Sequence, residues 1–308
     1  MSQGLKIDDE FLSLEGAANE FGIEWSGSPE VTRSEVITPD GAVSAVRWGG
    51  APVEAVLLHG RAPGQSARSW DSIALDWGVP VLAVDTPGHG FSAQRADRRY
   101  TPRLIAPAVG NAIAALAPAP PLIVGVSFGG LTTIALAALR PELVKAIALV
   151  DILPRFEAPP AGSLAPEAKA DPGPPAEPER FGSRQEIIDA LSSGATLSRE
   201  AIARSVTANT VQLDDGSWVW RFDAGVKVAP GELDFPGLWD DLLALQAPIL
   251  LVRGGKSPVV ADEVVAELQE RRPDVTVVTV DDAGHEIHDE RPRKLARILA
   301  DFHSKLEL

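Results

Sequence analysis

The sequence contains no cysteine among its 308 residues, and only one methionine and one tyrosine. Without cysteine the chain has no disulfide, no thiolate nucleophile and no cysteine-ligated zinc, so any covalent catalysis must use another side chain. No stretch approaches the roughly 18 consecutive apolar residues of a membrane-spanning helix. The first residues, MSQGLKIDDEFLSLEG, are acidic where a secretion signal has a basic flank and an apolar core. We therefore expect a soluble, cytoplasmic protein that does not bind membranes.

Basic residues are also scarce. The chain has 28 lysines and arginines against 43 aspartates and glutamates, which gives a formal net charge of -15. Binding to nucleic-acid phosphates requires clustered lysine and arginine, so we expect no nucleic-acid partner. Hydrophobic residues make up 45% of the chain, enough for a full core. The expected partner is a small-molecule substrate, and the composition leaves the oligomeric state open between monomer and homodimer.

Short, apolar, β-branched runs alternate with helix-like segments along most of the chain, which is typical of a largely parallel sheet covered on both faces. Six runs predict strands, at residues 54–60, 79–85, 121–127, 144–151, 247–254 and 275–281. Before them, two alternating runs in SEVITPDGAVSAVRW meet at Pro39-Asp40-Gly41, which predicts an antiparallel hairpin at the start of the sheet. Helices are predicted at 69–77, 102–117, 129–140, 260–271 and 292–305.

Residues 152–246 interrupt this alternation and divide the predicted core into 1–151 and 247–308. The interval opens with a stretch rich in proline, alanine and glutamate, so we expect a mobile loop at 154–180. Two helix-like pieces follow, each beginning with an N-capping serine. A turn, the aromatic run SWVWRFD and a short helix in LWDDLLAL complete the interval. We interpret residues 152–246 as a cap over the carboxyl edge of the sheet.

The pentapeptide GVSFG, residues 125–129, lies between an apolar strand and a helix-like segment. A serine in a strained turn between strand and helix is held out at the edge of the sheet, and small flanking glycines let the backbone pass closely. Ser127 is therefore the candidate nucleophile. The backbone N–H of Phe128 then points from a helix N-terminus toward the oxyanion that forms when a serine attacks a carbonyl.

A second oxyanion donor is expected from the turn His59-Gly60-Arg61, which ends an earlier apolar strand. The backbone N–H of Arg61 is the candidate donor. We interpret His59 as a structural residue that fixes this loop by hydrogen bonding.

Five segments resemble the α/β-hydrolase superfamily in order and spacing: LLHGR (57–61), VDTPGHGFS (84–92), GVSFGG (125–130), ALRPELVKAIALVD (138–151) and AGHEIHDERP (283–292). The resemblance implies an α/β-hydrolase fold, with a mostly parallel eight-stranded sheet flanked by helices and a helical cap inserted between the sixth and seventh strands. It also implies the branch of the superfamily that uses a serine nucleophile, which requires neither an organic cofactor nor a metal.

The resemblance implies that His285, in the loop after the last strand, is the general base. Elimination among the five histidines agrees, because His59 and His89 lie in early glycine-rich loops and His303 lies in a terminal helix. His288 is the remaining competitor. His285 is favoured because it stands at a tight turn directly after the strand.

The position of the acid is open. A carboxylate on the other nitrogen of the histidine fixes its tautomer and stabilises its cation. The commonest position in the family, in the turn after the seventh strand, is occupied by Ser257 in the segment LLVRGGKS. Asp151 is favoured, because it ends the sixth strand at the same sheet edge as Ser127. Asp262 is a second candidate, although it also fits the start of a helix, and a chain without a true acid is the third. If Asp151 is the acid, Ser257 is left free.

A serine nucleophile favours acyl chemistry. We expect a serine hydrolase that cleaves a carboxylic ester, lactone or related acyl bond of a small, partly apolar molecule through an acyl-enzyme on Ser127. Trp218, Trp220, Trp239 and Phe156 are predicted to contact the substrate, although the tryptophans suit a small core of the cap equally well. Hydrolysis of a carbon–carbon bond and acyl transfer would use the same residues. A non-catalytic ligand-binding protein of this fold is the alternative from another class.

Overall fold

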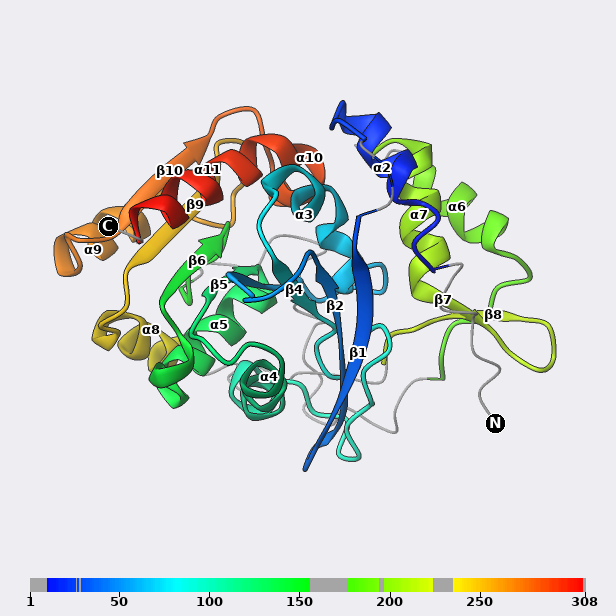
Figure 1. Ribbon diagram of the computed structural model, residues 1–308, viewed down its shortest axis with the longest axis horizontal. Helices are drawn as coiled ribbons and strands as arrows, with labels where there is room; N and C mark the ends of the chain where they lie inside the picture. Colours follow the sequence, from blue (N-terminus) through cyan, green and yellow to red (C-terminus); the bar gives the residue numbers. More distant parts are fainter. Residues whose placement is uncertain are drawn as a thin grey trace.

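The computed structural model describes residues 10–25, 27, 29–155, 177–193, 197–223 and 235–306. One large sheet runs through the centre of the molecule with helices on both faces, and a smaller unit lies to one side of it (Figure 1). Among the described residues, no helix is both long enough and apolar enough to cross a bilayer.

The central sheet has eight strands in the order β1-β2-β4-β3-β5-β6-β9-β10. Their bounds are β1 Val31–Thr38, β2 Gly41–Trp48, β3 Ala55–Leu58, β4 Val81–Val84, β5 Leu122–Val126, β6 Ala146–Val150, β9 Ile249–Gly254 and β10 Thr276–Val280. Strand β2 is antiparallel to both of its neighbours, and all the other pairs are parallel. Because helices cover both faces, every residue of β3, β4, β5 and β6 is buried.

The predicted hairpin at the start of the sheet is confirmed. Thr38 and Gly41 face each other across the two-residue turn, and Gly41 has a φ of 114°. A φ in this range is open to glycine but strained for other residues, so the sequence Pro39-Asp40-Gly41 fixes both the turn and the register.

Helices α4 (Pro102–Leu116), α5 (Phe128–Leu139), α8 (Phe235–Ala244) and α9 (Asp262–Arg271) pack on one face of the sheet. Helices α3 (Asp71–Trp77) and α11 (Pro292–Lys305) pack on the other face, with the 3-10 turn η1 (Ala67–Trp70) leading into α3. The five helices predicted in the core are confirmed to within a few residues. The short helices α2 (Leu14–Phe21), α10 (Ile287–Glu290) and the 3-10 turn η2 (Pro141–Leu143) were not predicted.

The smaller unit consists of α6 (Arg184–Ser192), α7 (Arg199–Asn209) and the two-stranded sheet of β7 (Thr210–Gln212) and β8 (Trp218–Trp220). Its N-caps are those predicted, since Ser183 accepts a hydrogen bond from the Glu186 N–H and Ser198 accepts one from the Ala201 N–H. We call this unit, residues 177–193 and 197–223, the cap. Of the predicted mobile loop at 154–180, residues 156–176 lie outside the described part of the chain.

Helix α8 falls within the interval that the sequence analysis assigned to the cap, but it packs against α5 on the central sheet. Leu238, Trp239 and Leu242 are buried there among residues of the main core. Figure 1 shows α8 beside α5, on the side of the sheet away from α6 and α7. Among the described residues of this interval, the cap therefore ends before α8.

Backbone hydrogen bonds join the cap to the loop after β4. The Gly90 N–H donates to the Arg221 carbonyl at 2.9 Å, and the Asp223 N–H donates to the Gly88 carbonyl at 2.8 Å. The Asp223 carboxylate also pairs with Arg98 and accepts a hydrogen bond from the Tyr100 hydroxyl at 2.8 Å. The chain leaving β8 is thus bound tightly to the core.

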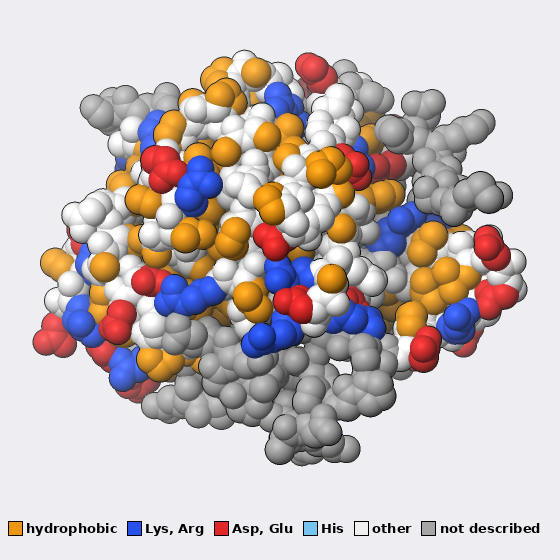
Figure 2. Space-filling model, turned by 90° about the horizontal axis from the view of Figure 1, so that it is seen from below, with side chains coloured by type: hydrophobic (Ala, Val, Ile, Leu, Met, Phe, Trp, Pro, Cys, Tyr) orange, Lys and Arg blue, Asp and Glu red, His pale blue; other side chains and the backbone are white. Residues whose placement is uncertain are grey.

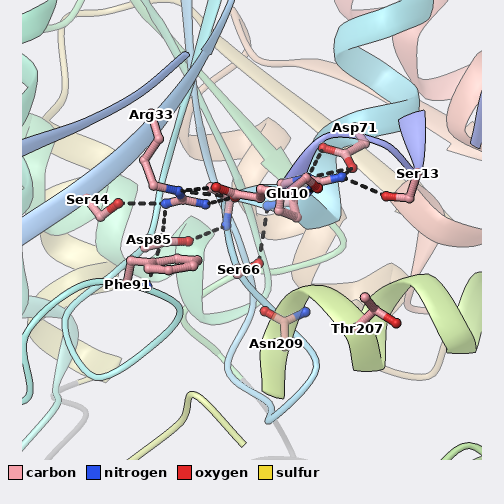
Figure 3. A network of polar contacts seen from close by, with 12 residues as sticks. Glu10, Ser13, Arg33, Ser44, Ser66, Asp71, Asp85, Phe91, Thr207 and Asn209 are labelled. Atoms are coloured by element: carbon pink, nitrogen blue, oxygen red, sulfur yellow. Dashed lines mark hydrogen bonds and ion pairs between the residues drawn. The ribbon is translucent and has the colours of Figure 1, made fainter. Parts of the chain in front are cut away.

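A buried polar network also holds the loop that follows β4 (Figure 3). Arg33 on β1 pairs with Glu10 and, at 2.6 Å, with Asp85 at the end of β4. Asp85 also accepts hydrogen bonds from the backbone N–H groups of Ala67, at 2.7 Å, and Phe91, at 3.0 Å. A charge-paired carboxylate with several donors fixes the loops on both sides of it, which are the loops that follow β3 and β4.

Candidate active site

Ser127 stands at the turn between β5 and α5, with a φ of 51° and a ψ of −122°. This backbone conformation is strained for a non-glycine residue and is sustained by the packing around it. A Cβ at Gly125 would lie 2.4 Å from the Gly129 carbonyl oxygen, and one at Gly129 would lie 2.3 Å from the Leu58 carbonyl oxygen. The two glycines are therefore required for α5 to begin so close to β5 and β3.

The two segments expected to supply oxyanion donors lie beside Ser127. Phe128 is the first residue of α5, so its N–H has no acceptor inside the helix and lies at the positive end of the helix dipole. A Cβ built on Gly60 would be 3.6 Å from the Ser127 Cβ, which places the turn His59-Gly60-Arg61 beside the serine. The geometry thus brings both predicted donors to the nucleophile, and their role in catalysis remains a prediction.

His59 fixes this turn. Its Nε2 accepts a hydrogen bond from the Thr86 N–H at 3.0 Å, so its Nδ1 carries the proton and donates to the Gly60 carbonyl at 2.7 Å. Burial lowers the pKa of His59 below its usual 6.5, and the nearby Asp85 only partly opposes this. A neutral histidine with both nitrogens engaged agrees with the structural role expected for it.

His285 and Asp151 are hydrogen-bonded to each other. Nδ1 of His285 lies 2.8 Å from Oδ2 of Asp151, which is fully buried at the end of β6. The other carboxylate oxygen, Oδ1, accepts the Gly254 N–H at 2.8 Å. Because a carboxylate only accepts, Nδ1 of His285 carries the proton, and Nε2 is left as the basic nitrogen.

The alternative acid, Asp262, is in a different environment. Its side chain is 84% exposed at the start of α9 and pairs with Arg253. The strand order explains the difference, because β6 lies between β5 and β9 in the sheet. An acid at the end of β6 is therefore next to the nucleophile's strand, whereas Asp262 has already entered the following helix.

The charge state of His285 depends on this pairing. Burial lowers the pKa of His285, but the hydrogen bond from Nδ1 to Asp151 and the charges of Glu286, Asp151 and Glu290 outweigh it, so the pKa lies above 6.5. The environment thus favours the imidazolium that would form when His285 takes a proton from a nucleophile. Among the described residues, no hydrogen bond yet joins His285 to the Ser127 hydroxyl, a contact that commonly forms only with substrate bound.

His288, the other candidate base, is held in the core. Its side chain is fully buried, its Nε2 lies 3.3 Å from the Gln65 side-chain oxygen, and its ring lies 5.4 Å from that of Trp70. Burial lowers the pKa of His288. The structure therefore pairs His285, and not His288, with the carboxylate.

The structure corrects one expectation, that Ser257 would be left free. The Ser257 hydroxyl donates a hydrogen bond to Oδ2 of Asp151, the same oxygen that contacts His285. The sequence carried a signal for this contact, since Ser257 occupies the position at which an acid was expected. The error lay in considering that position only as a possible source of a carboxylate.

Comparison with known proteins agrees with the fold. Residues 55–298 match the sequence profile of the alpha/beta hydrolase family. The chain belongs to this family. It is 40% identical over 294 residues to Esterase Rv0045c of Mycobacterium tuberculosis, covering 94% of both chains.

Solved structures of other hydrolases have the same fold as this hydrolase. A crystal structure of the M. tuberculosis esterase Rv0045c superposes with a TM-score of 0.79 at 37% sequence identity, covering 98% of this chain and 99% of that one. The structure of E-2-(acetamidomethylene)succinate hydrolase has a TM-score of 0.70 at 19% identity, covering 89% of this chain and 99% of that one. The second likeness shows the fold alone.

The aromatic residues predicted to contact substrate lie in different environments in this hydrolase. Trp218 and Trp220 pack against the small core of the cap, which is formed by Ile187, Ile202 and Val206. Trp239 is only 6% exposed and belongs to the main core, so its position does not favour a pocket role. Phe156 lies outside the described residues. For Trp218 and Trp220, substrate contact stays a prediction beside their observed packing.

A cavity of about 360 Å³ lies between the cap and the core. From the cap it is lined by Ile202 and Ala208 of α7, and from the core by Gln65, in the loop after β3. Its lining also includes Glu286, which directly follows His285. The cavity is partly apolar and touches both loops that carry parts of the site, but Ser127, His285 and Asp151 are not among the residues that line it.

Within the described residues, one group has the composition of a metal site, namely Glu286, His288 and Asp289. Glu286 lies 3.6 Å from Nδ1 of His288, and Asp289 lies 3.6 Å from Nε2. One ligand atom from each of the three residues lies within 4.8 Å of the other two. Acidic groups of this kind are common without an ion, and the absence of a metal requirement stays a prediction.

Proposed function

We propose that this hydrolase is a serine esterase that cleaves carboxylic esters of small, partly apolar molecules through an acyl-enzyme on Ser127. The observation that supports the proposal best is the 2.8 Å contact between His285 and the buried Asp151, at the sheet edge where Ser127 is held in a strained turn. The esterase activity of the relative from M. tuberculosis, 40% identical, supports the same reaction.

In the proposed mechanism, the Ser127 hydroxyl attacks the ester carbonyl while Nε2 of His285 takes its proton. The imidazolium keeps its hydrogen bond to Asp151, and the carbonyl oxygen, now negatively charged, is bound by the N–H groups of Phe128 and Arg61. Collapse of this intermediate expels the alcohol, which receives the proton from His285. Water activated by His285 then hydrolyses the acyl-enzyme by the same two steps.

The substrate class is proposed from the surroundings of the site. The cavity between cap and core is partly apolar and includes Glu286, but neither Ser127 nor His285 lines it, so it supports only a nearby surface for the apolar portion of a small ligand. On the face seen in Figure 2, described lysines and arginines are interspersed with acidic side chains. This pattern supports the expectation of a small-molecule substrate in place of a polyanion. A cytoplasmic location remains part of the proposal and would be tested by cell fractionation.

A panel of p-nitrophenyl esters of increasing acyl length tests the function. The wild-type protein is expected to hydrolyse members of the panel, with a preference that reports the size of the acyl pocket. Ser127→Ala should abolish turnover, whereas Ser304→Ala, which changes an exposed serine on α11, should not. Retention of activity in Ser127→Ala would assign the hydrolysis to another residue. Absence of hydrolysis in the wild type would favour a ligand-binding member of the family.

A further inference from the structure

We propose that Ser257 is a positioning residue for the acid: its hydroxyl holds Asp151 in place and moderates the basicity that Asp151 confers on His285. The inference rests on the proposed function, since it assigns Asp151 and His285 their roles in the reaction. It starts from the observation that Oδ2 of Asp151 contacts both the Ser257 hydroxyl and Nδ1 of His285.

The direction of the hydrogen bond from Ser257 is determined by its other contact. The Val259 N–H donates to Oγ of Ser257 at 3.2 Å, so the hydroxyl oxygen is already an acceptor. Its single proton is then available for the carboxylate, which can only accept. The turn formed by residues 257–259 therefore orients the hydroxyl proton toward Oδ2 of Asp151.

The loop that carries Ser257 is fixed to the segment that carries His285. The Gly255 N–H donates to the Val280 carbonyl and the Lys256 N–H donates to the Ala283 carbonyl, both at 2.9 Å. The Ser257 N–H closes the turn by donating to the Gly254 carbonyl at 3.1 Å. Since Ala283 is two residues before His285, the hydroxyl and the imidazole approach Asp151 from one connected backbone unit.

Three donors thus share the carboxylate of Asp151: the Gly254 N–H on Oδ1, and the Ser257 hydroxyl and His285 on Oδ2. A hydrogen bond to a charged oxygen withdraws negative charge from it and restricts its rotation. Without the Ser257 hydroxyl, Oδ2 would stabilise the His285 cation more strongly. The carboxylate would also be held less firmly against the imidazole.

These two effects have separate readouts. In Ser257→Ala, the pKa of His285, measured by NMR titration with His285→Gln as the assignment control, should rise above the wild-type value. The acid limb of the kcat profile should move to higher pH in step with it. The kcat at its plateau should fall about tenfold, the loss expected for one hydrogen bond to a charged group. Ser257→Thr, which retains a hydroxyl, should restore all three. Ser304→Ala, which removes an exposed hydroxyl on α11, should change none of them.

The NMR readout keeps this inference separate from the proposed function. If the wild type hydrolyses no ester but the pKa of His285 still rises in Ser257→Ala, the esterase proposal fails and the role of Ser257 stands. If the wild type is an esterase and the pKa of His285 is unchanged or falls in a folded Ser257→Ala, the inference about Ser257 is overturned. Thermal unfolding of each variant establishes that it is folded.

Discussion

Ser257 and Asp151 are hydrogen-bonded across the ends of two neighbouring strands, β9 and β6. The contact places a hydroxyl where the family most often has an acid, and an acid one strand away. Asp151 still contacts the imidazole of His285, because its Oδ2 lies 2.8 Å from Nδ1, and Ser257 contacts the same oxygen. Compared with the family's commonest pattern, the carboxylate is thus at the end of β6 and not after β9, and it still contacts the histidine.

Asp151→Asn should reduce kcat by about three to four orders of magnitude while the protein stays folded. The amide keeps the size of the side chain but cannot stabilise the imidazolium of His285 or hold its tautomer. Asp262→Asn is the matched control, because Asp262 is exposed on α9 and should contribute little. Steady-state kinetics on a p-nitrophenyl ester, with circular dichroism to check folding, makes the measurement. A larger loss in Asp262→Asn than in Asp151→Asn would refute the assignment of the acid.

The pH dependence of kcat/KM should show an acid limb above pH 6.5. His285 must be neutral to accept the proton from Ser127, and its hydrogen bond to Asp151 and the neighbouring acids raise its pKa above 6.5 despite burial. Activity is thus present above the pKa of His285 and lost as the pH falls through it. In Asp151→Asn the residual activity should show this limb at lower pH. If the acid limb of the kcat/KM profile lies at the same pH in Asp151→Asn as in the wild type, Asp151 does not raise the pKa of His285.

Gly254→Ala should damage both stability and activity. A Cβ at Gly254 would lie 2.1 Å from the Gly284 carbonyl oxygen, in the residue before His285, so the loop that carries the base would have to move. Crowding of this kind costs about 1–3 kcal/mol of stability, and displacement of the base lowers kcat further. Gly50→Ala is the control, because a Cβ there meets nothing within 4 Å. The free energy of unfolding, measured in urea, and kcat should both fall in Gly254→Ala. Both should be nearly unchanged in Gly50→Ala.

Asp289→Asn should stabilise the protein much more at about pH 8 than at about pH 4. Burial and the neighbouring Glu290 raise the pKa of Asp289 to about 7, with Arg204 opposing, against 3.8 in an ordinary site. The folded state therefore binds a proton more tightly than the unfolded state, so stability falls as the pH rises from about 4 to about 7 and changes little above that. Asp282→Asn is the control, since its partner Arg291 lowers the pKa of Asp282. Equal shifts of Tm at both pH values in Asp289→Asn would contradict this account.

Much of the core was predictable from the sequence because local signals and burial agree there. Strands β3 to β6 are apolar along their whole length, as buried parallel strands must be, and the hairpin is fixed by a turn that requires Gly41. The strained turn at Ser127 was predictable for a similar reason. Its flanking glycines are needed in the folded chain, and they are also visible in the sequence.

The remaining features depend on contacts between distant segments. Helix α8 follows the irregular interval in sequence, and only its packing against α5 shows that it belongs to the core. For the same reason Trp239 could not be distinguished from the cap tryptophans. Asp151 and Asp262 were both chemically suitable, and the order of β5, β6 and β9 in the sheet decided between them. The contact of Ser257 joins residues 106 positions apart, which no local pattern records.

The central claim is that His285 and Asp151 activate Ser127 as a nucleophile. It is tested most directly by mass spectrometry after treatment of the native protein with a fluorophosphonate. The account predicts one phosphonyl adduct per chain, located on the peptide that contains Ser127, with labelling slowed at least about a thousandfold in His285→Ala. Absence of an adduct on the folded wild-type protein, or equal labelling of wild type and His285→Ala, would contradict it.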